Sequence, residues 1–270
     1  MFKKFFNATF TLFVAYFICH VIYLAVRYIS LNIIGIDEAA FYFTSVYYDP
    51  YAYESWSRLK IFLVYGLPSF SMFLVALISL TSFLKTEKDN LRIRVFFLWL
   101  FLVGLSVLMA DIFKAPFIRG DLASVYEWFY LKKEFAFLVA ILAFLPIPFI
   151  ASKIDRVFLK TADSRYWIKS RKNRTIYFLN KTLFPLLVVF IFFATLVLVV
   201  PSYKLQHLFQ TEIIRFFTLS IFLILGAYFA YSKKYIEVKK VNDFQLVSKS
   251  KIAVITLFII AVYILLWFSF

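Results

Sequence analysis

The sequence has few of the residue types from which most enzyme active sites are built. It contains one cysteine, two histidines and five glycines. One cysteine excludes an internal disulfide, and a metal site needs three or four ligands, which Cys19 and the adjacent His20 do not supply. Five glycines are too few for phosphate-binding loops, and no G-x-x-x-x-G-K-[ST] or G-x-G-x-x-G motif is present. We therefore expect no metal and no cofactor.

Charged residues are absent from long parts of the chain, which is 63% apolar. Seven runs of at least sixteen residues lack Asp, Glu, Lys and Arg. A helix rises about 1.5 Å per residue, so about 20 residues cross a hydrocarbon core of about 30 Å. We predict an all-α, polytopic membrane helix bundle, a single transmembrane domain over residues 1–270. Its seven transmembrane helices are expected at residues 5–26, 61–84, 95–113, 135–152, 182–203, 216–232 and 252–270.

The basic residues lie mainly on one side of these predicted spans. The N-terminus and the segments after the second, fourth and sixth spans hold 21 of the 30 basic residues and six acidic ones. The other side holds nine of each sign, so the whole formal charge of +15 falls on one side. Cytoplasmic loops retain Lys and Arg, which predicts a cytoplasmic N-terminus, an external C-terminus and a bacterial inner-membrane location. Basic loops suit anionic lipid headgroups, and without a nucleic-acid-binding motif we expect no nucleic-acid partner.

Aromatic side chains are concentrated in the longest external segment, residues 31–60. Pro50 should prevent one continuous helix there. Tyr and Trp favour the headgroup level because one end of each side chain is apolar and the other polar, so we expect an aromatic belt. The alternative is a docking surface for a partner, formed by Tyr47, Tyr48, Tyr51, Tyr53 and Trp56.

The external segment between the third and fourth spans predicts a short amphipathic helix. Gly120 and Asp121 suggest a chain break followed by an N-cap, and apolar residues then recur at helical spacing as far as Lys133. We expect a helix over residues 121–133 lying in the membrane interface. A re-entrant hairpin is the alternative.

Charged residues just before this helix form the first candidate site. Asp111 and Lys114 have the i, i+3 spacing of a helical ion pair, which we expect at the headgroup level. The alternative is a functional site that also includes Arg119 and Asp121, because charges at a membrane boundary are often functional.

Two features inside the predicted spans are further candidates. His20 lacks the partners of an H-E-x-x-H zinc motif, so we expect a hydrogen-bonded structural role for it. Pro68, Ser69 and Ser71 interrupt the second span, and the fourth contains a Pro-x-Pro sequence. Helix kinks are the simpler explanation of these prolines, and a ligand site between broken helices is the alternative.

No pattern in the sequence names a reaction. His207 and Glu212 have H-x-x-x-x-E spacing, but no surrounding motif accompanies them, and we interpret the spacing as coincidence. We expect a non-enzymatic accessory or scaffold subunit with a membrane-protein partner in the lipid bilayer. The alternative is a transporter or lipid-handling protein that works at the broken second and fourth spans.

Overall fold

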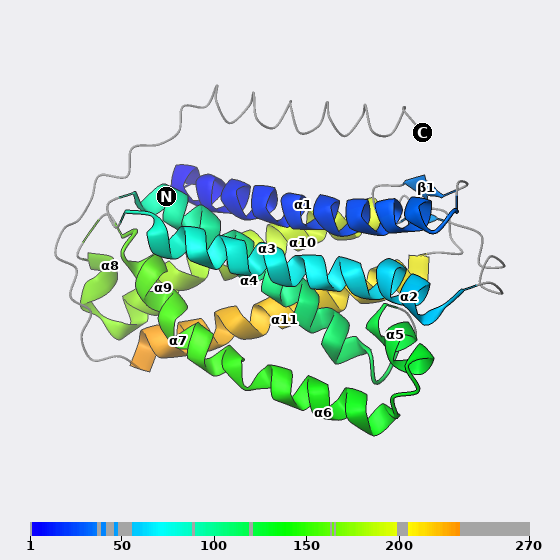
Figure 1. Cartoon of the computed structure of the whole chain (residues 1–270). Helices are drawn as coiled ribbons and strands as arrows, with labels where there is room; N and C mark the ends of the chain where they lie inside the picture. The colour runs from blue at the N-terminus through cyan, green and yellow to red at the C-terminus, as the bar shows by residue number, and fades with distance from the viewer. Residues whose placement is uncertain are drawn as a thin grey trace.

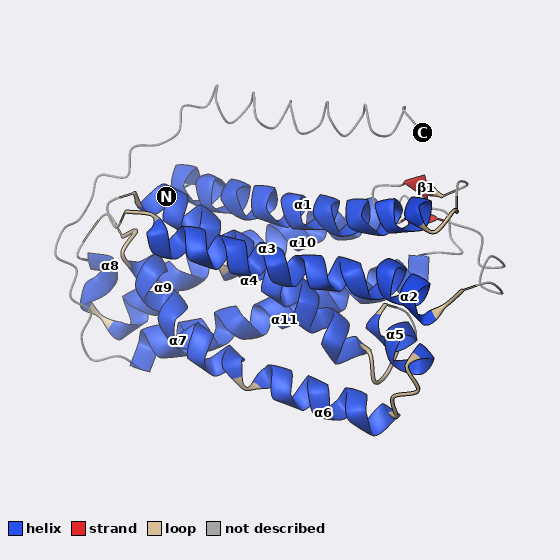
Figure 2. Cartoon of the chain, in the orientation of Figure 1, coloured by secondary structure: helices blue, strands red, loops and turns tan. Residues whose placement is uncertain are grey.

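The computed structural model describes residues 2–36, 39–41, 46–47, 56–87, 90–118, 121–162, 164, 166–198 and 205–232. The longer helical elements are α1 (Phe2–Ile33), α3 (Leu67–Lys85), α4 (Leu91–Lys114), α6 (Lys133–Phe144), α7 (Pro146–Leu159), α9 (Arg171–Lys181), α10 (Leu183–Leu198) and α11 (Leu205–Ser232). The shorter ones are α2 (Arg58–Ile61), the π-helix η2 (Phe62–Gly66), α5 (Leu122–Trp128) and α8 (Tyr166–Lys169). The two-residue strands β1 (Ala40–Phe41) and β2 (Val46–Tyr47) form an antiparallel ladder (Figure 2). These helices confirm the all-α prediction.

Six of the helical units are long and apolar enough to cross a membrane, which indicates an integral membrane protein. They are Asn7–Ile33, Arg58–Lys85, Leu91–Lys114, Lys133–Leu159, Arg171–Thr195 and Gln210–Ser232. The seventh predicted span, residues 252–270, lies outside the described residues. The helices of the first, third and sixth spans continue past the charge-free runs and include charged residues, among them Arg27, Asp111, Lys114, Glu212 and Arg215.

Successive spans run in opposite directions and lie side by side (Figure 1). The N-terminus, α8 and α9 lie at one end of the bundle, and α2, α5 and β1 lie at the other. We call these the α8 end and the α5 end. Because of this alternation, the last turns of α1 and α4 and the first turns of α11 all lie at the α5 end.

Helix α4 is the most buried span and α6–α7 the least. Trp99, Leu102 and Val103 of α4 are completely buried. Gly104 lets α3 approach α4 closely, because a Cβ atom at this position would lie 3.2 Å from the backbone oxygen of Met72. In contrast, α6 lies at the edge of the bundle with large apolar side chains exposed (Figure 1). A surface of this kind is suited to lipid rather than water.

The second and fourth spans depart from a regular α-helix near their prolines. The π-helix η2 precedes Pro68 at the start of α3, and Pro146 begins α7 after the break at Leu145. Proline lacks a backbone N–H donor, so it is best tolerated in the first turn of a helix. The fourth span is therefore interrupted for one residue at Leu145, whereas η2 continues directly into α3, so the second span is distorted at this point but not broken.

The helix in the α4–α6 connection is shorter than predicted. It covers Leu122–Trp128, not residues 121–133. Tyr130 adopts a left-handed conformation with φ +57°, and Lys133 is the first residue of α6. The apolar periodicity that suggested a single helix therefore continues across a turn.

Candidate functional site: a buried ionic network

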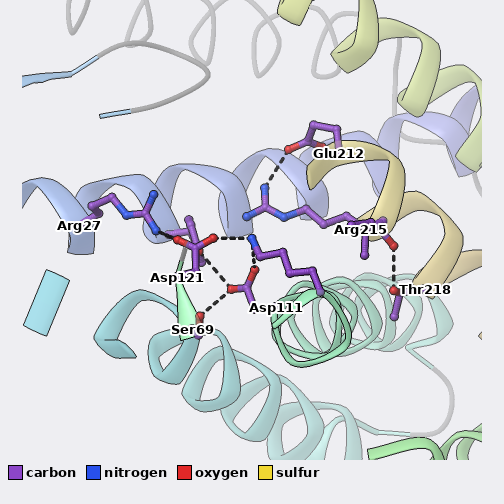
Figure 3. Close-up of polar contacts among 10 residues, drawn as sticks. Arg27, Ser69, Asp111, Asp121, Glu212, Arg215 and Thr218 are labelled. Carbon is purple, nitrogen blue, oxygen red and sulfur yellow. Dashed lines mark hydrogen bonds and ion pairs between the residues drawn. The ribbon is translucent and has the colours of Figure 1, made fainter. Parts of the chain in front are cut away.

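Charged residues from three spans meet at the α5 end of the bundle. Two of the charged pairs have i, i+3 spacing, Asp111 with Lys114 in the last turn of α4 and Glu212 with Arg215 near the start of α11. Arg27 comes from the end of α1. We define the ionic network as these charged residues together with the polar groups that bind them, namely Tyr16, Tyr23, Arg27, Ser69, Asp111, Lys114, Asp121, Glu212 and Arg215 (Figure 3).

One part of the ionic network is a closed ring of contacts. The Lys114 ammonium lies 2.9 Å from Oδ1 of Asp111 and also binds the Asp121 carboxylate. Arg27 binds the other oxygen of Asp121 and donates to the Tyr23 hydroxyl at 3.3 Å. Tyr23 in turn donates to Oδ2 of Asp111 at 3.1 Å. The ring therefore joins α1 and α4 to the residue that precedes α5.

The second part joins α11 to the middle of α1. Arg215 pairs with Glu212 at 2.8 Å, and the Tyr16 hydroxyl donates to the other oxygen of that carboxylate. The Arg215 guanidinium carbon lies 4.8 Å from the centre of the Tyr23 ring, and that of Arg27 lies 5.3 Å from the same centre. Both distances suit cation–π attraction. Tyr23 thus connects the two parts.

The network is buried inside the protein. Asp111 is 0% exposed and Lys114 3%, and Asp121, Glu212 and Arg215 are each at most 6% exposed. The three acids and three bases cancel in formal charge. A buried charge without a partner is very costly, so this mutual pairing is what makes burial possible. The Asp111–Lys114 pair is therefore enclosed by protein, and its expected place at the headgroup level stays a prediction.

The network also reaches deep into the bundle. Tyr16 and Arg27 are eleven residues apart on α1, which corresponds to about 16 Å at about 1.5 Å per residue. This is roughly half of a hydrocarbon core of about 30 Å. The network therefore extends over about that length of α1, from Arg27 to Tyr16, where Tyr16 meets Glu212 of α11.

The backbone conformation at Asp121 directs its side chain towards the ionic network. It occupies the N-cap position of α5, but its side chain makes no capping hydrogen bond. Its φ is +41°, a conformation that costs a residue with a Cβ atom about 1–3 kcal/mol. The carboxylate points instead to Arg27 and Lys114 (Figure 3). The predicted cap is thus an ion-pair partner.

Of the two serines near the distortion of the second span, one belongs to the network. Ser69, at the start of α3, donates to Oδ2 of Asp111 at 2.5 Å and is completely buried. Ser71 donates to the backbone oxygen of Pro68 at 2.6 Å. The helix interruption therefore directs Ser69 towards α4, while Pro68 and Ser71 act within α3 itself.

His20 lies beside the network on α1. It is buried, and its ring packs edge-on against Phe193 of α10 at 5.5 Å between ring centres. It is also close enough to Glu212 to interact electrostatically. Among the described residues, no group of three His, Cys, Asp or Glu side chains is arranged to hold a metal ion.

The aromatic segment, residues 31–60, is only partly described. Trp56 is 6% exposed and packs against Tyr65 of η2 at 6.1 Å between ring centres. Trp56 therefore packs against the second span, and the docking surface stays a prediction. Tyr47 belongs to β2, and the side chains of the other candidates, Tyr48, Tyr51 and Tyr53, lie outside the described residues, as does Arg119.

Sequence reasoning missed five members of the network, which are Tyr16, Tyr23, Arg27, Glu212 and Arg215. A signal was present, because both α4 and α11 carry an acid followed three residues later by a base beside an apolar run. Antiparallel packing brings such pairs together at one end of a bundle. The comparisons with known proteins add no further member.

No protein-family model, curated protein or solved structure matches the chain. Its function must therefore be inferred from the geometry of the ionic network and of the surfaces around it.

Proposed function

We propose that the protein is a non-enzymatic accessory or scaffold subunit of a membrane assembly. The main support is that the charges of the ionic network neutralise one another. Each carboxylate contacts a basic group of the same network. A charged solute would have to replace one of these contacts, and a buried charge left without its partner costs about 3–5 kcal/mol. This favours a network that fixes helices over one that binds and releases a solute.

The proposed role of the network is to specify one helix arrangement. Buried ionic groups add little net stability compared with apolar packing, but in some proteins they select a single packing register. Here they connect α1, α3, α4, α11 and the start of α5. A subunit with one fixed arrangement presents a constant lipid-facing surface, which a membrane partner can recognise.

We place the α8 end in the cytoplasm. Exposed basic residues at this end include Arg171 and Lys172 at the start of α9, and Lys153 and Arg156 on α7. Cytoplasmic segments retain such residues, and anionic headgroups attract each of them by about 1 kcal/mol near the surface. In this orientation the ionic network lies towards the external side of the membrane.

A transporter or lipid-handling protein is the second candidate. Its support is the π-helix η2, because π-helical turns inside longer helices are frequently found at functional sites. This turn precedes Ser69, which binds a buried carboxylate. The break between α6 and α7 is a second interruption of the kind used in transporters.

The test of the scaffold is purification of the tagged full-length chain from native membranes in mild detergent. We expect one other membrane protein to co-purify in near-equal amount, as identified by mass spectrometry. The control is an unrelated multi-span protein with the same tag and expression level. Recovery of the chain alone, even after cross-linking in intact cells, would contradict the proposal.

The double variant Ser69→Ala/Ser71→Ala separates the two candidates. In a scaffold, this variant should keep its partner and complement a strain lacking the protein. In a transporter that uses these hydroxyls, it should fail to complement while accumulating in the membrane at the wild-type level. The second result would favour transport.

A further inference from the structure

A pocket opens where the end of α4, the helix α5 and the start of α6 meet. Its volume is about 270 Å³. Its lining includes small residues, namely Ala115, Pro116, Ala123 and Ala136. Polar side chains at its edge are Tyr126, Glu127, Lys132 and Lys133. It is separate from the ionic network, whose side chains do not line it.

We propose that this pocket binds the phosphate headgroup of an anionic phospholipid, with its acyl chains lying along α6. This inference goes beyond the proposed function and does not depend on it. It rests on the charge of the pocket, its depth in the membrane and the apolar surface beside it.

The charge of the pocket favours an anion. Lys132 and Lys133 are exposed and outnumber the one lining carboxylate, that of Glu127. The two lysines also lie at the N-terminus of α6, where the helix dipole attracts negative charge. Burial raises the pKa of Tyr126, so its hydroxyl stays protonated and can donate to a phosphate oxygen.

The turn between α5 and α6 places the lysines at the pocket. Tyr130 has φ +57°, and the N–H of Leu131 donates to the backbone oxygen of Tyr126 at 2.9 Å. The chain therefore folds back after α5. As a result, Lys132 and Lys133 lie beside Tyr126 along the edge of one pocket.

The pocket lies at the depth of lipid headgroups. One membrane-spanning helix ends at Lys114, just before the pocket, and the next begins at Lys133 on its edge. Charges at the ends of spanning helices occupy the interface between hydrocarbon and water. A phosphate that contacts both α5 and α6 is therefore within reach of a lipid in the same leaflet.

The surface beside the pocket fits acyl chains. Phe117, which lines the pocket, is 72% exposed and packs edge-on against Phe137 of α6 at 5.2 Å. Leu138 and Ile141 continue this surface and are 53% and 61% exposed. An apolar track continuous with a cationic pocket suits a phospholipid better than free phosphate.

The test measures phosphatidylglycerol binding to the purified, delipidated full-length chain by native mass spectrometry and by thermal unfolding in detergent. We expect a one-to-one lipid complex and a raised melting temperature, since a ligand that binds only the folded state stabilises it. Phosphatidylcholine and inorganic phosphate are the comparison probes, and both should bind much more weakly.

Lysine variants test the assignment of the site. Lys132→Gln/Lys133→Gln should weaken phosphatidylglycerol binding by about tenfold or more, because charge-assisted contacts to phosphate are lost. Lys132→Gln alone should give an intermediate loss. The matched control is Lys153→Gln/Arg156→Gln at the other end of the same span. Lys153 packs over Phe149 much as Lys133 packs over Phe137, with distances of 5.3 Å and 5.9 Å.

The results that overturn the proposal are distinct. Equal binding by the wild type and both lysine variants would show that the pocket is not the site. Equal affinity for phosphatidylcholine would show that only the acyl chains contribute to binding. Equal stabilisation by inorganic phosphate would make free phosphate the ligand. Loss of binding in the Lys153/Arg156 control alone would place the lipid at the α8 end.

Discussion

The Lys114 ammonium neutralises two carboxylates of the ionic network. It contacts Asp111 on its own helix and Asp121 before α5. Arg27 assists at Asp121 only, and Ser69 and Tyr23 supply neutral donors to Asp111. Removing the ammonium therefore leaves Asp111 buried with hydrogen-bond donors but without its nearest positive charge.

Lys114→Met should be strongly destabilising. The expected loss is about 3–5 kcal/mol in the free energy of unfolding, as for other buried pairs that lose one partner. The measurement is equilibrium unfolding in mixed detergent micelles. Adding Asp111→Asn to the same chain should recover part of the loss, because the uncompensated charge is removed. The control is Lys153→Met, at an exposed site, which should change the free energy of unfolding by at most about 1 kcal/mol. A comparable loss in both lysine variants would contradict the role of Lys114 in the ionic network.

The two serines of the second span should behave differently. Ser69→Ala removes a hydrogen-bond donor from a buried carboxylate and should lower the free energy of unfolding by about 1–2 kcal/mol. This loss lies between the typical energy of a hydrogen bond to a charged group and the average energy of a hydrogen bond between membrane helices. Ser71→Ala removes only a bond to the Pro68 carbonyl and should be nearly neutral. Melting temperatures in detergent distinguish the two variants. A larger loss for Ser71→Ala would mean that the π-helical turn, not the network, is the sensitive element.

At the scale of helices, α3 and α4 form the closest pair in the bundle. Gly104 on α4 faces the backbone of α3 at Met72 and Ala76. A Cβ atom at Gly104 would lie 3.2 Å from one backbone atom and 3.4 Å from another, and backbone atoms cannot move aside as side-chain ends do. Close backbone approach of this kind is typical of small residues in membrane helices.

Gly104→Val should separate α3 from α4. We expect a loss of about 1–3 kcal/mol from overpacking, with Gly104→Ala intermediate. Thermal unfolding measures the loss, and a distance probe between the two helices checks the separation. Ile93→Val, at an exposed position on the same helix, is the control and should be close to neutral. An unchanged melting temperature for Gly104→Val would show that the helices pack less tightly than this geometry requires.

The helices themselves could largely be predicted from the sequence, because long charge-free runs and prolines are local signals. The ionic network could not, and for a specific reason. The first run ends at Val26, the third at Ala110, and the sixth begins at Phe216. The next residues outward are Arg27, Asp111 and Arg215, so a search for uncharged segments stops one residue before the first network charge of each of the three spans.

Two smaller features of the structure that the sequence did not reveal also have physical causes. The helix predicted to reach Lys133 ends at Trp128, since Tyr130 takes a left-handed conformation that no local pattern in the sequence signals. Trp56 belongs to the segment for which the sequence predicts an aromatic belt or a docking surface, and its side chain packs against Tyr65, which is nine residues away along the chain. Such side-chain burial depends on where the following helix turns. It is a tertiary property rather than a compositional one.

At the scale of the whole molecule, the charged residues at the two ends of the bundle differ in exposure and in balance of sign. The α8 end carries basic residues that are exposed and exceed the acids, whereas the network at the α5 end is neutral and buried. Six charges of the balanced side, three of each sign, cancel within the ionic network. The charge asymmetry on which the predicted orientation depends therefore resides in the loops of the α8 end.

Reporter fusions measure this orientation directly. We expect fusions after Arg171 and Lys240 to read cytoplasmic and a fusion after Ser124 to read external, because the loop that contains Arg171 carries the largest number of basic residues. Ser124 in α5 and Arg171 at the start of α9 lie at opposite ends of the bundle, so equal signals at these two sites would contradict the six-span arrangement itself. Opposite signals with the signs exchanged would leave the bundle intact and reverse its insertion.

A fusion after Phe270 then decides the last predicted span. An external signal there, with a cytoplasmic signal after Lys240, requires residues 252–270 to cross the membrane, and matching cytoplasmic signals at both sites would limit the chain to six spans.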